Sequence, residues 1–123
     1  MKPNIRVLHI RDAIERIEKE TKNLTYLNLT ENDTVLRAVM YDIMIIGEAS
    51  KNAPEDLKTT YADIPWKNIS GTRDKLVHDY FDIDTDIVWN IISHELPKLK
   101  TAVTSYISKH PEIKELDENT VGS

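Results

Sequence analysis

The stretch that decides the fold is ENDTVLRAVMYDIMIIGEASK, residues 31–51. Its apolar side chains recur at the spacing of one helical face, as Leu36, Val39, Met40, Ile43 and Ile46. Met44 and Ile45 widen this stripe, so we expect residues 31–51 to form the most buried helix of the protein. Thr30, with Asp33 three residues later, predicts a capping-box-like start for this helix.

Helical periodicity continues on both sides of this stretch. Residues 3–22 carry an apolar stripe made of Val7, Ile10, Ile14 and Ile17. A long last helix is expected over residues 84–110, with Pro97 bending it and Pro111 stopping it. A third helix of modest length is expected from about Ser70.

Between Pro54 and Pro65 the periodicity breaks, which predicts a loop with a short turn at residues 55–60. No segment alternates as a strand does. The sequence therefore predicts an all-α fold, an antiparallel bundle of four principal helices.

The length of 123 residues, with 40% hydrophobic and 30% charged residues, is typical of one folded domain. We expect the helical domain to comprise residues 1–110, and residues 111–123 to form a polar, acidic tail with a frayed outer end. Cysteine is absent, which excludes disulfides, thiolate nucleophiles and sulfur-ligated zinc sites. Neither a signal peptide nor a membrane span is expected, so a cytoplasmic location is predicted.

Histidine is the usual acid or base near neutral pH, and the chain has four. For His9, His94 and His110 the sequence favours exposed or capping side chains, because none has a second histidine at metal-ligand spacing. The acidic run from Asp82 to Asp86 fails the EF-hand pattern at its Gly and Glu positions, and no Gly-rich phosphate loop occurs. No metal or cofactor is therefore expected.

His78 has more informative neighbours. Asp74 lies four residues before it on the same helical face, a spacing that lets the carboxylate orient the imidazole and favour its protonated form. Arg73 and Tyr80 share another stripe, about 140° around a straight helix from His78. One straight helix therefore cannot aim all three at one point: either it ends before Tyr80 or a second copy of the chain completes the site. From spacing alone, a solvated face with surface ion pairs is the favoured interpretation.

Short motifs follow one another along most of the chain. They are HIRDAIERI at 9–17, IIGEA at 45–49, IPW at 64–66, Gly71, RDKLVHDYF at 73–81, ID at 83–84, IVW at 87–89 and LPKL at 96–99. In this order and spacing they resemble the HepT-like proteins of the HEPN superfamily, over about residues 5–108.

The resemblance implies a toxin of a toxin–antitoxin module: a metal-independent endoribonuclease that uses no cofactor. The family's R-x4-H-x-Y motif matches Arg73, His78 and Tyr80. His78 would act on the ribose 2′-hydroxyl or the leaving oxygen, and Arg73 would steady charge on the phosphorus-bound oxygens. Asp74 would support them.

The resemblance also implies partners. RNA would be the substrate, and a homodimer would line one cleft with both copies of the motif. Tyr80 matches the tyrosine that a cognate minimal nucleotidyltransferase antitoxin modifies with AMP, and the added charge and bulk would block RNA. Further assembly with that antitoxin, and no association with membranes, are expected.

Two other interpretations stay open. One is a non-catalytic binding partner or antitoxin-like subunit of a nucleotidyltransferase, favoured by the acidic balance and by broad apolar stripes. The other is that the motif face is only structural.

Charge bears on the choice, since 16 Lys and Arg oppose 21 Asp and Glu for a formal net charge of −5. Phosphate binding requires cations, so an acidic chain is a poor first guess for an RNA binder. Residues 111–123 carry −3 of this charge, however, which leaves −2 for residues 1–110. The charge therefore does not exclude RNA, and it predicts weak, salt-sensitive affinity.

Overall fold

The computed structural model describes the backbone of residues 3–78 and 84–121, and the side chains of residues 3–72 and 84–116. The helices are α1 (Pro3–Thr21), α2 (Tyr26–Glu31), α3 (Asp33–Lys51), α4 (Glu55–Thr60), α5 (Trp66–His78), α6 (Thr85–Asn90), a π-helical turn (Ile91–Glu95), α7 (Leu96–Ser108) and α8 (Pro111–Val121). Within these ranges there is no strand, and the all-α prediction is confirmed.

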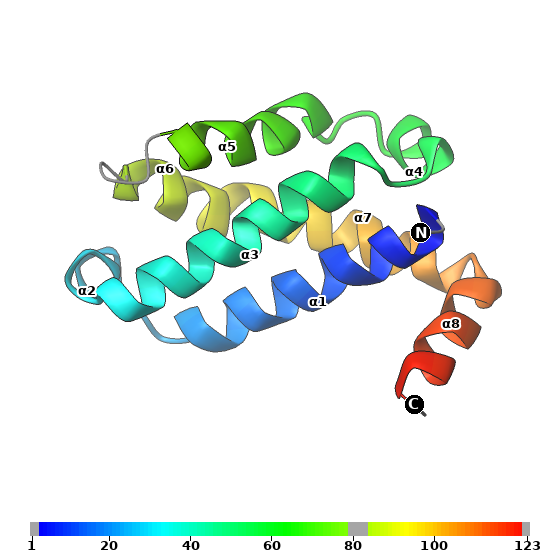
Figure 1. Ribbon diagram of the computed structural model, residues 1–123, viewed down its shortest axis with the longest axis horizontal. Coiled ribbons are helices and arrows are strands. Elements are labelled where there is room, and N and C mark those ends of the chain that lie inside the picture. Colours follow the sequence, from blue (N-terminus) through cyan, green and yellow to red (C-terminus); the bar gives the residue numbers. More distant parts are fainter. Residues whose placement is uncertain (1–2, 79–83, 122–123) are drawn as a thin grey trace.

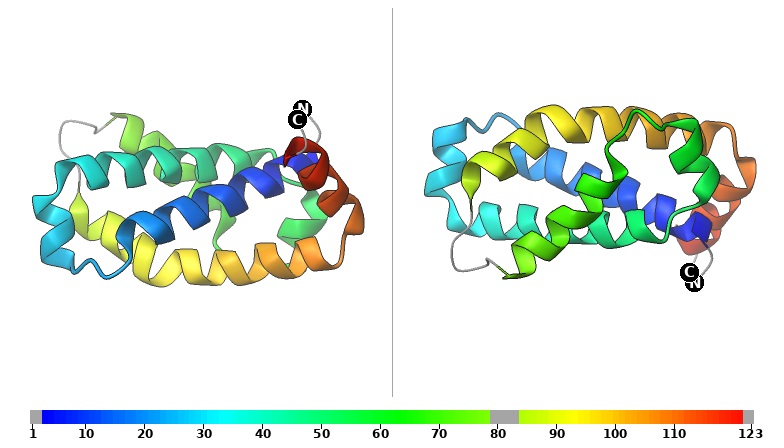
Figure 2. Two further views of the ribbon diagram at one scale, coloured as in Figure 1. Left: turned by 90° about the horizontal axis from the view of Figure 1, so that it is seen from below. Right: turned by 90° about the horizontal axis from the view of Figure 1, so that it is seen from above.

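The long helices alternate in direction along the chain (Figure 1). Helix α1 packs mainly against α3, and α3 in turn packs against α5. Helices α6 and α7, joined by the π-helical turn, form one rod that lies against α1 (Figure 2). This is the predicted antiparallel bundle of four principal helical units.

The apolar stripes predicted for residues 3–22 and 31–51 form the core. The members of both stripes are buried, apart from Met44 and Ile45, which are half-buried and pack against the core. The last helix adds Val88, Leu96, Leu99 and Val103 to the same core. None of the described helices has the length and apolar character needed to cross a membrane.

The predicted cap at Thr30 is wrong. Thr30 lies in the last turn of α2, where its hydroxyl donates to the Leu27 carbonyl at 2.7 Å. A cap must precede the helix, and Asn32 does so for α3: its Oδ1 accepts from the Val35 N–H at 3.1 Å. The capping box itself occurs earlier, where Thr25 begins α2 together with Asn28.

Two other boundaries differ from the prediction. Helix α5 begins at Trp66 rather than near Ser70, because Pro65 suits the position before its first turn and its carbonyl accepts from the Ile69 N–H at 3.1 Å. The short turn expected at residues 55–60 is a full helix, α4, which buries Leu57.

The bend expected at Pro97 takes the form of the π-helical turn. Proline has no N–H to offer the Ser93 carbonyl four residues earlier, and its ring crowds that carbonyl. The helix widens just before it, and the Leu96 N–H donates to the carbonyl of Ile91, five residues back. At the predicted start of this rod, Asp84 Oδ1 accepts from the backbone N–H groups of Asp86 and Ile87 at 3.0 and 3.3 Å.

Residues 111–121 form helix α8, where the sequence predicts a polar tail. Ile113 is completely buried and Leu116 packs against the core. These two apolar residues, three apart in an otherwise polar segment, anchor the first turns of α8 on the bundle.

One carboxylate lies inside the α1–α3 interface. Asp42 of α3 is only 3% exposed, and its Oδ1 accepts from Arg16 Nε of α1 at 2.9 Å. The Arg16 side chain is 48% exposed, so it pairs with Asp42 while still reaching water. A buried carboxylate needs such a partner, because an unpaired charge in the interior is strongly destabilising.

This unequal burial predicts unequal effects of breaking the pair. Arg16→Ala should lower the free energy of unfolding by about 3 kcal/mol, because it leaves the Asp42 carboxylate buried without its cation. Asp42→Asn should cost about 1 kcal/mol, because the amide is neutral and Arg16 remains hydrated. Urea unfolding at neutral pH measures both values, and an equal or reversed order would contradict the proposed role of the pair.

Glu20 lies beside the same pair, and its Oε2 is buried with no hydrogen-bond partner among the described residues. Burial raises the pKa of Glu20 above its ordinary value of 4.5; the Asp42 carboxylate adds to the rise and Arg16 opposes it. Protonated Glu20 therefore stabilises the fold below pH 4.5, and this stability is lost as the pH rises through the pKa of the folded protein.

Glu20→Gln should therefore raise the free energy of unfolding at neutral pH, since glutamine is never charged. The gain should be no more than about 0.5 kcal/mol, because solvent screens this half-buried side chain. The advantage should shrink as the pH falls below 4.5, where Glu20 itself is neutral in both states. Thermal unfolding of both proteins across this pH range gives the test. A constant difference at every pH would show that charge on Glu20 is not the cause.

Candidate functional site

Helix α5, which carries most of the sequence motif, is held against the bundle by its first half. Ile69 is buried, and Trp66 is half-buried with its Nε1 donating to the Tyr61 carbonyl at 3.0 Å. Helix α3 supplies the main surface beneath it. The second half of α5 is therefore a direct continuation of an anchored helix.

Arg73, Asp74 and His78 all lie in this second half, and Tyr80 lies outside the described residues. The continuous helix over 66–78 gives Asp74 and His78 neighbouring positions on one face, as their spacing predicts. Arg73 occupies a different stripe of the same helix. The backbone brings three of the four predicted residues onto one element.

The outward face of α5 ahead of the motif is polar. Lys67, Asn68 and Gly71 are all exposed there. No ion pair to Lys67 occurs within the part of the chain that the structure describes. This face has a cation and no large apolar side chain among its described members.

Helix α6, on the far side of the segment that contains Tyr80, is anchored by α2. The Tyr26 hydroxyl donates to Asp86, and its ring meets Trp89 edge-on at 5.9 Å. The hydrogen bond to Asp86 is the largest cause of a raised pKa for Tyr26. Asp84 caps the same helix, so the start of α6 is held both by its own cap and by the contacts to α2.

His110 and His94 lie outside the motif-bearing helix, and their surroundings suit capping or exposed side chains. His110 stacks on Tyr106 at 3.9 Å, and its Nδ1 lies 2.8 Å from the Tyr106 carbonyl near the end of α7, which confirms the capping prediction. Its Nε2 is 3.6 Å from Asp56, which also accepts from the Tyr106 hydroxyl at 2.7 Å. Burial is the largest cause of a strongly raised pKa for Tyr106, and the bond to Asp56 adds to it. His94 is exposed in the π-helical turn.

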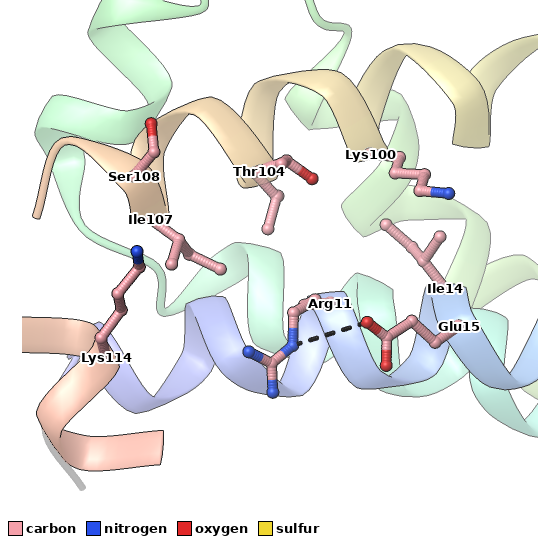
Figure 3. A pocket seen from close by; sticks show the side chains of 9 residues that line it. Arg11, Ile14, Glu15, Lys100, Thr104, Ile107, Ser108 and Lys114 are labelled. Atoms are coloured by element: carbon pink, nitrogen blue, oxygen red, sulfur yellow. Dashed lines mark ion pairs between the residues drawn. The ribbon is translucent and has the colours of Figure 1, made fainter. Parts of the chain in front are cut away.

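A groove of about 300 Å³ lies between α1, α7 and α8, on the side of the bundle away from α5 (Figures 2 and 3). Its floor is apolar, formed by Ile14, Val103 and Ile107. Two of the three cations at its rim are paired: Arg11 lies 3.9 Å from Glu15, and Lys100 lies 2.9 Å from Glu18. These pairs lower the attraction of this groove for an anion.

A second groove of about 340 Å³ separates α1 from α3 and contains His9. Its lining includes two arginines, Arg6 and Arg16, and two acids, Asp12 and Glu48. Arg16 is already the partner of buried Asp42. Within the described ranges, no three His, Asp or Glu side chains gather as metal ligands.

The comparisons with known proteins agree on one family. The model of the family described as ribonuclease HepT-like matches residues 10–106. A protein of Caldanaerobacter subterraneus whose name proposes an RNase is 34% identical over 101 residues, which cover 82% of this chain and 90% of that protein. The "Probable ribonuclease HepT" of Thermococcus cleftensis is 38% identical over 91 residues, covering 74% of this chain and 83% of its own.

A relative from Methanocaldococcus jannaschii, also with a name that proposes an RNase, is 35% identical over 112 residues, 91% of this chain and 90% of its own. No solved structure matches the chain. The family match spans α3, α5 and most of the α6–α7 rod, so it includes both the core and the motif-bearing helix. The chain belongs to the HepT-like ribonuclease family.

Proposed function

We propose that this ribonuclease is the toxin of a toxin–antitoxin module, a metal-independent endoribonuclease inactivated by AMP transfer to Tyr80. One observation carries the proposal: the R-x4-H-x-Y pattern is intact at Arg73, His78 and Tyr80, inside the stretch that matches the family. The first two of these residues lie on α5, whose first half is anchored on α3.

The reaction would use the ribose 2′-hydroxyl as nucleophile. Its oxygen forms a bond to phosphorus while the bond to the 5′-oxygen breaks, leaving a 2′,3′-cyclic phosphate and a 5′-hydroxyl. The proton lost by the 2′-hydroxyl must be accepted, and one must reach the leaving oxygen. His78 takes one of these roles because imidazole titrates near neutral pH. Asp74, on the same face, orients it and favours its charged form.

Arg73 would stabilise the negative charge that builds on the two non-bridging oxygens. A guanidinium is always charged and binds paired oxygens in a fixed plane, which suits a phosphoryl transition state. Because Arg73 and His78 lie on different stripes of α5, we propose that the residues of two protomers share one cleft. A homodimer would supply the two motifs from opposite sides.

AMP on Tyr80 would add a negative charge and a bulky group two residues beyond His78. RNA, itself an anion, would then be repelled from the cleft and excluded sterically. The enzyme that transfers AMP would be a minimal nucleotidyltransferase that uses ATP, and it would be the antitoxin and partner of this protein. The Tyr80 oxygen would lose its proton and bond to the α-phosphorus of ATP, while the bond to the β-phosphate breaks and pyrophosphate leaves.

His78→Ala should reduce the rate of RNA cleavage by about 10²–10⁴-fold, the usual contribution of a general acid or base. His94→Ala is the matched control, because this histidine is exposed in the π-helical turn and should leave cleavage unchanged. Cleavage of a labelled RNA by the purified protein in EDTA gives the rates. Undiminished cleavage by His78→Ala would refute the assigned role, and no cleavage by the wild type would favour the alternative of a non-catalytic partner of a nucleotidyltransferase.

Incubation with the cognate nucleotidyltransferase, ATP and Mg²⁺ should add the mass of one AMP group to the wild-type chain and abolish RNA cleavage. Tyr80→Phe should gain no mass, because it lacks the accepting hydroxyl. Tyr41→Phe serves as the control, since Tyr41 is the most exposed tyrosine among the described residues, at 66%. Intact-mass spectrometry reads the result, and modification of Tyr80→Phe to the wild-type extent would place the acceptor elsewhere.

A further inference from the structure

Gly71 lies in the interior of α5, where glycine is a poor choice for the stability of the helix. Its φ is not positive, so the backbone conformation does not require glycine. A Cβ added to it would meet no heavy atom of the described chain within 4 Å, so packing against the described residues does not require glycine either. The missing side chain leaves open space on an exposed surface.

This open space lies on the stripe that carries the motif histidine. Gly71 precedes His78 by seven residues and Asp74 by three, and it follows Lys67 by four. In a continuous α-helix these intervals bring the four positions to one side. The absent side chain therefore forms a notch two turns before His78, between that position and an exposed lysine.

We propose that Gly71 is the point where the sugar–phosphate backbone of the RNA comes closest to α5, which makes it a positioning residue for cleavage at His78. The inference rests on the proposed function. Without a side chain at this position, a phosphodiester can lie against the helix backbone, while Lys67 one turn away offers a cation to it.

The surroundings favour RNA over a second copy of the chain as the group that fills the notch. A helix from another protomer would be expected to meet apolar side chains at the centre of the contact. The described neighbours of Gly71 on this face, Lys67 and Asn68, are polar and exposed. The exposed large apolar side chains of the described chain lie on other helices, as Tyr26 and Leu27 of α2 and Tyr41 of α3.

Filling the notch separates stability from activity. Gly71→Ala should raise the melting temperature by about 2–4 °C, because alanine favours the helix and its methyl group clashes with none of the described residues. The same methyl group should push the RNA away from His78 and slow cleavage about tenfold or more, since misplacement by about 1 Å can cost 10²-fold. Gly71→Leu should slow it further.

Thr104→Ala is the matched control. It also replaces a poor helix former by alanine on an exposed helix surface, but it lies on α7, on the side of the bundle away from α5, and adds no atoms to the notch. Each variant is compared by thermal unfolding, by cleavage rate, by affinity for an uncleavable 2′-fluoro RNA and by sedimentation velocity. We expect both alanine variants to be stabilised, and only Gly71→Ala to lose RNA affinity and cleavage.

A Gly71→Ala protein that is stabilised but cleaves and binds RNA as the wild type does would overturn the inference. The proposed function would not be affected, because His78→Ala tests it separately. Dissociation of the dimer by Gly71→Ala would assign the notch to a second copy and would also overturn the inference. Should the wild type bind RNA without cutting it, the proposed function fails, yet the 2′-fluoro RNA still decides whether Gly71 is the point of closest approach.

Discussion

The burial of α3 is the constraint on which the rest of the bundle depends. Its buried positions extend from Leu36 to Ser50 and include neighbours in sequence, such as Asp42 with Ile43 and Ile46 with Gly47. A helix buried so widely cannot face water along one flank, so α1 covers one side and α5 covers another. Helix α5 is therefore held in place largely because the apolar surface of α3 has to be covered. Its outward face remains free for polar residues that contribute little to stability.

The Arg16–Asp42 pair makes the packing of α1 on α3 specific for one register. Isoleucine and valine stripes on α1 and α3 tolerate sliding, because apolar contacts have little directionality. The buried Asp42 carboxylate, 2.9 Å from Arg16 Nε, does not tolerate sliding. A shift of one helix past the other by one turn would leave this carboxylate without its partner. We infer that the pair fixes the register of α1 on α3. The position of α5 is set against a helix whose own register is already fixed.

The sequence predicts what periodicity determines and misses what single contacts determine. The stripes around Ile14 and Ile43 identify their helices because burial repeats along them. The cap at Asn32, the turn that relieves Pro97, and the anchoring of α8 by Ile113 depend on one or two residues each, so no repeat reveals them. Motif spacing correctly places Asp74 and His78 on one face of a helix. It gives no sign of the contact from Tyr26 to Asp86, 60 residues away, which fixes the helix on the other side of Tyr80.

Net charge is a weak guide to RNA binding in this protein because many of its acids already have partners. Asp84 caps α6 and Asp86 accepts from Tyr26, so the nearest described acids after the motif are held by hydrogen bonds and by the positive end of a helix. Lys100 is paired on the far side of the bundle with Glu18. On α5 itself the exposed cation Lys67 precedes an unfilled position at Gly71. A strand of RNA bound as we propose would respond to this local arrangement over a few ångströms, whereas exposed charges farther away than about 8 Å are screened at physiological salt.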